Sequence, residues 1–132
     1  MKNGGIGMIK IAPSILAADF SKMGAEVKRM EECGADLIHC DVMDGNFVPN
    51  ITFGPDMIKA VKRNTNLPLD VHLMIDNPAF YIPAFADAGA DILTFHYELH
   101  YTHKPMEMIK MIKDKGVKAA ISVNPDTEPE GL

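Results

Sequence analysis

Two short apolar segments each carry a histidine and a carboxylate two positions apart, and this pairing constrains the fold more than any other feature. The first segment, 36–43, contains His39 and Asp41; the second, 69–75, contains Asp70 and His72. Because successive side chains of a strand point to opposite faces, each pair shares one face of its strand. An imidazole or carboxylate left unpaired among apolar side chains is costly. Either ordinary hydrogen bonds in the core or a divalent cation must therefore satisfy these groups.

Apolar runs of strand length alternate with stretches of helical periodicity. The predicted strands are 9–16, 36–43, 69–75, 92–98 and 118–124, and the predicted helices are 21–33, 55–63, 78–88 and 104–115. Asn77 and Pro78 predict the start of the third helix, in which Pro83 predicts a kink or a later start. Glycines follow three of the helices (Gly34, Gly89 and Gly116). This alternation predicts a parallel sheet with right-handed crossovers.

Polar residues fall at the C-terminal ends of all the predicted strands. They are Ser14, His39, Asp41, His72, His96, Glu98 and Asn124. No Gly-rich phosphate turn follows the first strand, as an open doubly wound sheet would favour. Convergence of polar groups at strand ends is typical of a barrel. The sequence therefore predicts an α/β fold of the (β/α)8 type, with a flexible leader at 1–8 and about the first five βα modules in 9–132.

The composition of the chain argues against some classes of binding partner and cellular location. The formal net charge is -5 and no basic stripe is present, which argues against a nucleic-acid or membrane surface. No apolar run approaches the roughly 20 residues of a membrane span, and residues 1–10 lack the apolar core of a signal peptide, so we expect a cytoplasmic protein. Two cysteines are too few for a disulfide framework, and we expect both Cys33 and Cys40 to be reduced structural residues.

Three motifs together resemble the ribulose-phosphate 3-epimerase family. They are the segments Ile11–Phe20 (IAPSILAADF), His39–Asn50 (HCDVMDGNFVPN) and Leu69–Met74 (LDVHLM), and the likeness continues through 96–98 and 124–127. The resemblance implies a TIM-barrel type, ribulose-phosphate-binding domain. It also implies a metal-dependent enzyme that interconverts D-ribulose 5-phosphate and D-xylulose 5-phosphate by two-base proton transfer through an enediolate, in the pentose phosphate pathway.

The same resemblance assigns roles to individual residues. His39, Asp41 and His72 match ligands of one divalent metal, and Asp41 also matches one of two acid/base carboxylates. Zinc, manganese or iron suits such ligands, and the residues do not choose among them. Ser14 and His72 match substrate contacts. Met43 and Met74 match methionines that line the site, although plain core packing explains them equally well.

The chain also departs from the family pattern. Predicted strands start about 27 residues apart, so eight modules would need roughly 220 residues, and the five present lack the second catalytic Asp and the Gly-rich phosphate loops. We therefore expect these residues to be inactive alone, as a piece of a longer enzyme or as a shortened protein that forms homo-oligomers through its open sheet edges.

Three other functions stay open. They are an allulose-6-phosphate 3-epimerase, a non-catalytic metal-binding or assembly module, and a metal-dependent hydrolase. The hydrolase would use His96, Glu98 and His100, which share one face if the fourth strand extends that far.

Overall fold

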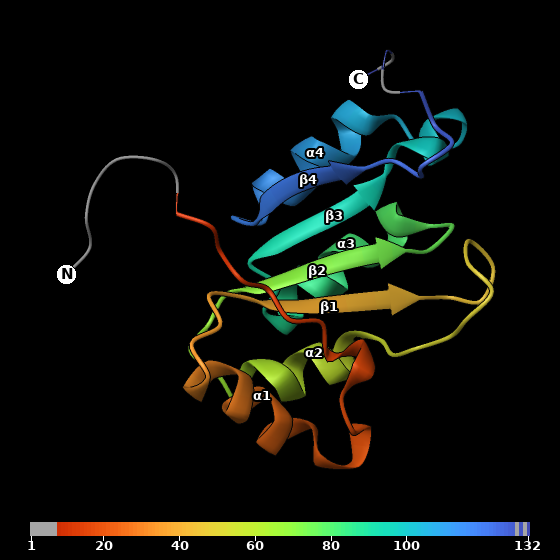
Figure 1. Ribbon diagram of the computed structural model, residues 1–132. Helices are drawn as coiled ribbons and strands as arrows, with labels where there is room; N and C mark the ends of the chain where they lie inside the picture. The colour runs from red at the N-terminus through yellow and green to blue at the C-terminus, as the bar shows by residue number, and fades with distance from the viewer. Residues whose placement is uncertain (1–7, 129, 131) are drawn as a thin grey trace.

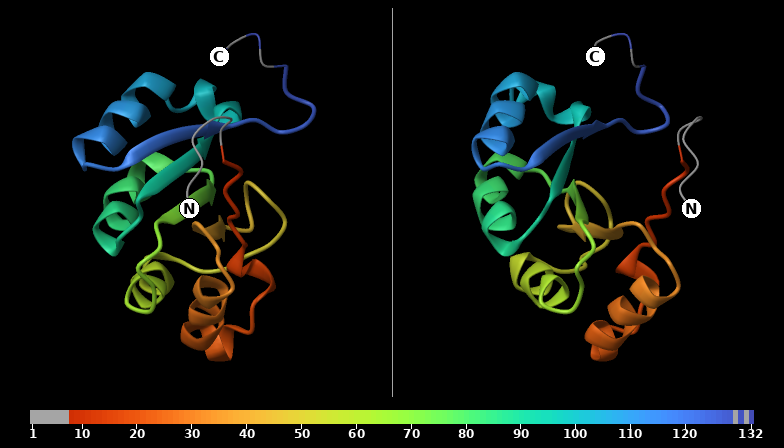
Figure 2. Two further views of the ribbon diagram at one scale, coloured as in Figure 1. Left: turned by 60° about the vertical axis from the view of Figure 1, so that its left-hand side comes forward. Right: turned by 90° about the vertical axis from the view of Figure 1, so that its left-hand side faces the viewer.

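The computed structural model describes residues 8–128, 130 and 132, and its centre is a parallel four-stranded sheet in the order β1-β2-β3-β4. The strands are β1 (Ile38–Met43), β2 (Leu69–Met74), β3 (Ile92–His96) and β4 (Lys118–Ser122). The helices are α1 (Met23–Glu32), α2 (Pro55–Lys62), α3 (Pro78–Ala88) and α4 (Pro105–Asp114). They follow one another along the outer side of a curved sheet (Figure 1, Figure 2). This is the predicted α/β fold, consistent with part of a (β/α)8 barrel.

Alternating burial fixes which side of β1 and β2 carries the polar residues. In β1 every second side chain is buried, namely Ile38, Cys40 and Val42, and β2 buries Leu69, Val71 and Leu73 in the same way. These side chains join one hydrophobic cluster with residues of the helices, among them Ile58 of α2 and Phe85 of α3. Each such burial contributes about 1.5–3 kcal/mol. A slip of one residue would reverse both faces, so the cluster holds the polar face in register.

The first predicted strand, 9–16, is not a regular strand, and that prediction is wrong in detail. The segment does run beside β1: the carbonyls of Ile11 and Pro13 accept hydrogen bonds from Asp36 and His39, and Ser14 forms one parallel bridge with His39. Pro13 has no N–H to donate to a ladder. From Ile15 the chain turns into a short 3-10 helix, η1 (Ile15–Ala17), whose first turn is capped by the Ser14 hydroxyl.

The repeated Gly-Ala-Asp sequence marks two equivalent helix-to-strand joints. The carboxylate of Asp36 accepts the N–H of Ile11, and the N–H of Asp36 is donated back to the Ile11 carbonyl. Asp91 makes the same pair of hydrogen bonds with Leu69. Each aspartate therefore fastens the start of its own strand to the start of the preceding segment, which sets the parallel alignment.

Helix ends follow the sequence signals closely. The third helix begins at Pro78 as predicted, with Asn77 as its N-cap, and it runs through Pro83 without a later start. It ends at Ala88, and its C-cap Gly89 has a φ of 114°, in the left-handed region that favours glycine. No helix within the described residues is long and apolar enough to cross a membrane. The leader predicted at 1–8 falls, except for Met8, outside the described residues.

Candidate metal centre

Asp41 lies at the centre of a cluster at the polar face of the sheet. One carboxylate oxygen, Oδ1, lies 3.0 Å from Nε2 of His39 and 3.4 Å from Nδ1 of His72. The other oxygen, Oδ2, accepts a short hydrogen bond from the hydroxyl of Ser14. The strand pairing explains this convergence, because Asp41 is the register partner of His72 and Ser14 bridges to His39. Segments that are far apart in sequence thus deliver four polar side chains to one place.

His39 is held from both sides by carboxylates. Its Nδ1 lies 2.8 Å from Oδ2 of Asp70, its register partner on β2, and its Nε2 faces Asp41. The hydrogen bond to Asp70 raises the pKa of His39 above its usual value of 6.5, against the opposing effect of burial. Asp70 therefore fixes the ring so that Nε2 points at Asp41.

His72 faces a second histidine on its far side. Its Nε2 lies 2.7 Å from Nε2 of His96 on β3, and the two rings are nearly parallel, 18° apart. Burial, followed by the neighbouring His96, lowers the pKa of His72 below 6.5. A neutral imidazole keeps one nitrogen lone pair, which is the form that binds a metal.

The three residues fit a divalent cation. One ligand atom from each of His39, Asp41 and His72 can be chosen so that all three lie within 4.8 Å of one another. The second nitrogen of each ring is already hydrogen-bonded to a neighbour, Asp70 or His96. Metal-binding histidines in proteins are oriented by such partners. Two imidazoles and one carboxylate with positions left open is also the donor set of a catalytic site.

The methionines predicted to line the site are register partners at the ends of their strands. Met43 follows Asp41 by two positions on β1 and pairs with Met74 on β2. Met43 is half-buried and Met74 is buried. Alternation along the strands places both on the side of the sheet that carries the cluster.

Comparison with known proteins identifies the chain's relatives. The model of the ribulose-phosphate 3-epimerase family matches residues 10–132. The chain belongs to this family. Ribulose-phosphate 3-epimerase of Bacillus subtilis is 59% identical over 124 residues, which are 91% of this chain and 54% of that protein. The chloroplastic enzyme of Arabidopsis thaliana, named ribulose-5-phosphate-3-epimerase, is 50% identical over 90% of this chain and 42% of its own length. The chain thus spans about half the length of these relatives.

The hydrolase alternative is wrong, because β3 ends at His96. Residues Tyr97–Tyr101 form the 3-10 helix η3, so His96, Glu98 and His100 do not alternate along a strand. His100 Nδ1 instead bonds the carbonyl of Tyr97, and its ring stacks on the Tyr97 ring. In this epimerase-family chain His96 joins the cluster around His72.

Three residues that contact the cluster in this family member were not among the metal ligands or substrate contacts predicted from the epimerase resemblance, although His96 and Glu98 belonged to the hydrolase alternative. They are Asp70, which contacts His39, His96, which contacts His72, and Glu98, which contacts His96. The signal for Asp70 was available, since it has the same spacing from His72 that His39 has from Asp41. The contact between His72 and His96 depends on how β2 pairs with β3, which local patterns do not encode.

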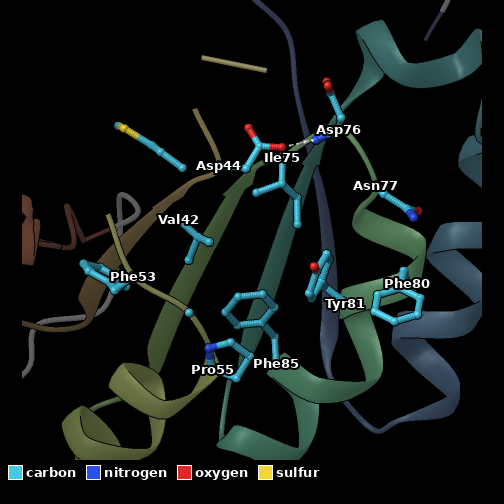
Figure 3. Close-up of a pocket in the computed structure, with 12 residues that line it drawn as sticks. Val42, Asp44, Phe53, Pro55, Ile75, Asp76, Asn77, Phe80, Tyr81 and Phe85 are labelled. Carbon is cyan, nitrogen blue, oxygen red and sulfur yellow. Dashed lines mark hydrogen bonds between the residues drawn. The ribbon is translucent and has the colours of Figure 1, made fainter. Parts of the chain in front are cut away.

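A separate hollow of about 500 Å³ lies beside the strand ends, lined by residues of β1, α2 and α3 and of the loops between them. Figure 3 shows Val42, Phe85 and Tyr81 around it, with Asp44 bonded to the backbone of Asp76 above them. Burial acts to raise the pKa of Asp44, but backbone hydrogen bonds from Asp76, Asn46 and Phe47 hold it below its usual value. None of the three candidate metal ligands lines this hollow.

Proposed function

We propose that this chain carries the metal-binding half of a ribulose-phosphate 3-epimerase, an enzyme that interconverts D-ribulose 5-phosphate and D-xylulose 5-phosphate. The observation that supports this proposal is the convergence of His39, Asp41 and His72 at one point on neighbouring parallel strands. The relatives' names supply the reaction, and the donor set suits it. The cytoplasmic location expected from the sequence stays a prediction.

Epimerisation beside a ketone needs a proton removed from one face of a carbon and a proton returned to the other. Asp41 is the proposed acid/base group on one face, acting at C3 of the sugar phosphate. A divalent cation held by His39, Asp41 and His72, whether zinc, manganese or iron, would supply positive charge for the oxygens that become negative during this transfer.

The neighbours of Asp41 would hold it ready for that transfer. The Ser14 hydroxyl donates to Oδ2 of Asp41, and Ser14 is a proposed contact of the sugar. His72 is also a proposed substrate contact. Met43 and Met74 are proposed to exclude water from the sugar without competing for its protons.

The second acid/base carboxylate and the phosphate loops of the family have no counterpart that we recognise in these 132 residues. We therefore propose that this chain alone binds metal but does not epimerise the phosphorylated ketopentose. The allulose 6-phosphate reaction is the weaker alternative, since the relatives compared are named for ribulose phosphate.

Metal binding is tested first. Protein purified without chelator is compared by elemental analysis with a His39→Ala, His72→Ala double variant, and Zn²⁺ titration calorimetry is run on both. We expect bound metal in the original chain and a loss of at least about tenfold in affinity in the variant. Equal, near-zero metal in both proteins would overturn the metal site.

Catalysis is tested by complementation. The C-terminal half of the Bacillus subtilis relative is supplied as a second polypeptide, and formation of xylulose 5-phosphate is followed. We expect activity to appear on mixing and Asp41→Asn to lower it by about 100-fold or more. The matched control is Asp87→Asn at an exposed aspartate that pairs with Lys115 on the surface. An inactive complex that is folded and metal-loaded would count against the epimerase.

A further inference from the structure

A chain of hydrogen bonds runs from the candidate metal ligand His72 to the segment that follows β4. His72 Nε2 contacts His96 Nε2 at 2.7 Å, and His96 Nδ1 contacts Oε2 of Glu98 at 3.2 Å. The other oxygen of Glu98, Oε1, accepts a hydrogen bond of 2.5 Å from the Thr127 hydroxyl and a short one from the Asn124 N–H. His96 is 5% exposed, so water is largely excluded from the middle of this chain.

The direction of these hydrogen bonds follows from Glu98. Burial acts to raise the pKa of Glu98, but hydrogen bonds from Thr127 and the Asn124 N–H outweigh this effect and lower the pKa to about 2. An ionised carboxylate only accepts, so Nδ1 of His96 must carry a proton. In neutral His96 the Nε2 atom is then an acceptor, and the hydrogen between the two rings belongs to Nε2 of His72. That leaves Nδ1 of His72 without a proton, 3.4 Å from Asp41.

We propose that Glu98 and His96 are positioning residues that fix the tautomer of His72, with the proton on Nε2 and the lone pair of Nδ1 directed at the metal site. This inference deepens the proposed metal site and rests on it. The proposal also gives the segment after β4 a part in the site, because Asn124 and Thr127 orient the carboxylate of Glu98, where this series of hydrogen bonds begins. Residues from β2, β3 and the segment beyond β4 thereby determine one ligand atom.

Glu98→Gln tests the direction with almost no change in shape. Asn124 and Thr127 both donate, so they select the amide oxygen of the new side chain and leave its NH₂ group facing Nδ1 of His96. That donor reverses the direction of the hydrogen bonds. His96 then donates from Nε2 to Nε2 of His72, and the proton of His72 moves to Nδ1. A protonated Nδ1 cannot bind a cation.

The readout is nitrogen-15 NMR of the histidine side chains, which reports the protonated nitrogen of each ring without any metal present. We expect the Nε2-protonated tautomer of His72 in the original chain and the Nδ1-protonated form in Glu98→Gln. Zn²⁺ affinity should fall by about 10- to 100-fold in the variant. Glu107→Gln is the control, since it makes the same substitution at an exposed glutamate that pairs with Lys104, and His72 should keep its tautomer.

The outcomes separate the two proposals. A His72 that carries its proton on Nδ1 in the original chain, or one whose tautomer is the same in Glu98→Gln, overturns the positioning role even if Zn²⁺ binds. The expected tautomers together with no Zn²⁺ binding support the positioning of His72 and overturn the metal site. A second variant, His96→Gln, retains an acceptor for His72 Nε2 and should retain Zn²⁺ binding, whereas His96→Leu should weaken it. Equal affinities in these two variants also overturn the role of His96.

Discussion

His39 on β1 and Asp70 on β2 are register partners, and Nδ1 of His39 lies 2.8 Å from Oδ2 of Asp70. Neither residue reaches this arrangement through local sequence, since 31 positions separate them. The contact exists because parallel pairing brings equivalent positions of the two polar faces side by side. It turns Nε2 of His39 toward Asp41, as a ligand of the candidate metal site would need.

Asp70→Asn is expected to weaken metal binding without removing a ligand. An amide can still accept from Nδ1 of His39 but carries no charge, so the pKa of His39 should fall back toward 6.5 and its basicity as a ligand should decrease. We expect a Zn²⁺ affinity about tenfold lower by calorimetry, together with a lower His39 pKa by NMR titration. An unchanged pKa would show that Asp70 does not control this ring.

The alternation of polar and apolar residues predicted which side chains of the cluster lie on the same face of their strand. Alternation of His39 and Asp41 with buried Ile38 and Cys40 leaves one register for a strand that packs under helices. The third helix was predicted with its observed bounds because Asn77-Pro78 and Gly89 mark both ends. Such signals depend on residues within a few positions of one another.

The failures share a different cause. Pro13 interrupts the predicted first strand through the loss of a single N–H, which apolar periodicity does not register. The spacing of His96 and Glu98 predicted a continuing strand, but the chain turns into η3 immediately after His96. The partners of these two residues, His72 and Thr127, come from other elements, so only the assembled sheet brings these contacts together.

Gly45→Ala should destabilise the loop that follows β1. Gly45 has a φ of 75°, and a Cβ atom there would lie 2.6 Å from Cγ1 of Ile51. Left-handed backbone and this contact together should lower the free energy of unfolding by about 1–3 kcal/mol. Gly54→Ala is the control, since no atom lies within 4 Å of its added Cβ and its φ of -120° is ordinary. Urea unfolding curves with the same midpoint for both variants would contradict the expectation.

The two thiols should differ sharply in reactivity. Cys33 is exposed at the end of α1, whereas Cys40 is fully buried, and burial raises the pKa of its thiol to about 12. Because the thiolate is the reactive form, a disulfide reagent should modify one cysteine quickly in the folded chain and the second only in denaturant. In a Cys33→Ser variant no fast reaction should remain. Two fast thiols in the original chain would mean that β1 is not packed under the helices.

Self-association is expected through the outer edge of β4. Within the described residues β4 pairs with β3 alone, so its other edge presents backbone groups without a strand partner. Several apolar side chains are also exposed, among them Ile9 and Ile11 beside the start of β1. Light scattering over a dilution series should show a mass that rises with concentration. A constant monomer mass of 14.5 kDa at all concentrations would refute this prediction.

Lowering the pH should remove the stabilisation that ionised Glu98 gives to the folded chain. The pKa of Glu98 is about 2 in the folded chain and 4.5 ordinarily, so its contribution is present above pH 4.5 and is lost as the pH falls through 2. With a side chain that is 20% exposed, the contribution is about 2 kcal/mol after solvent screening. Urea unfolding of the original chain and of Glu98→Gln should therefore differ most at neutral pH and converge between pH 4.5 and 2. Glu107→Gln, at an exposed glutamate, is the control and should differ little from the original chain at any pH. A gap between the original chain and Glu98→Gln that stays constant down to pH 2 would show that Thr127 and Asn124 do not hold this carboxylate in its ionised form.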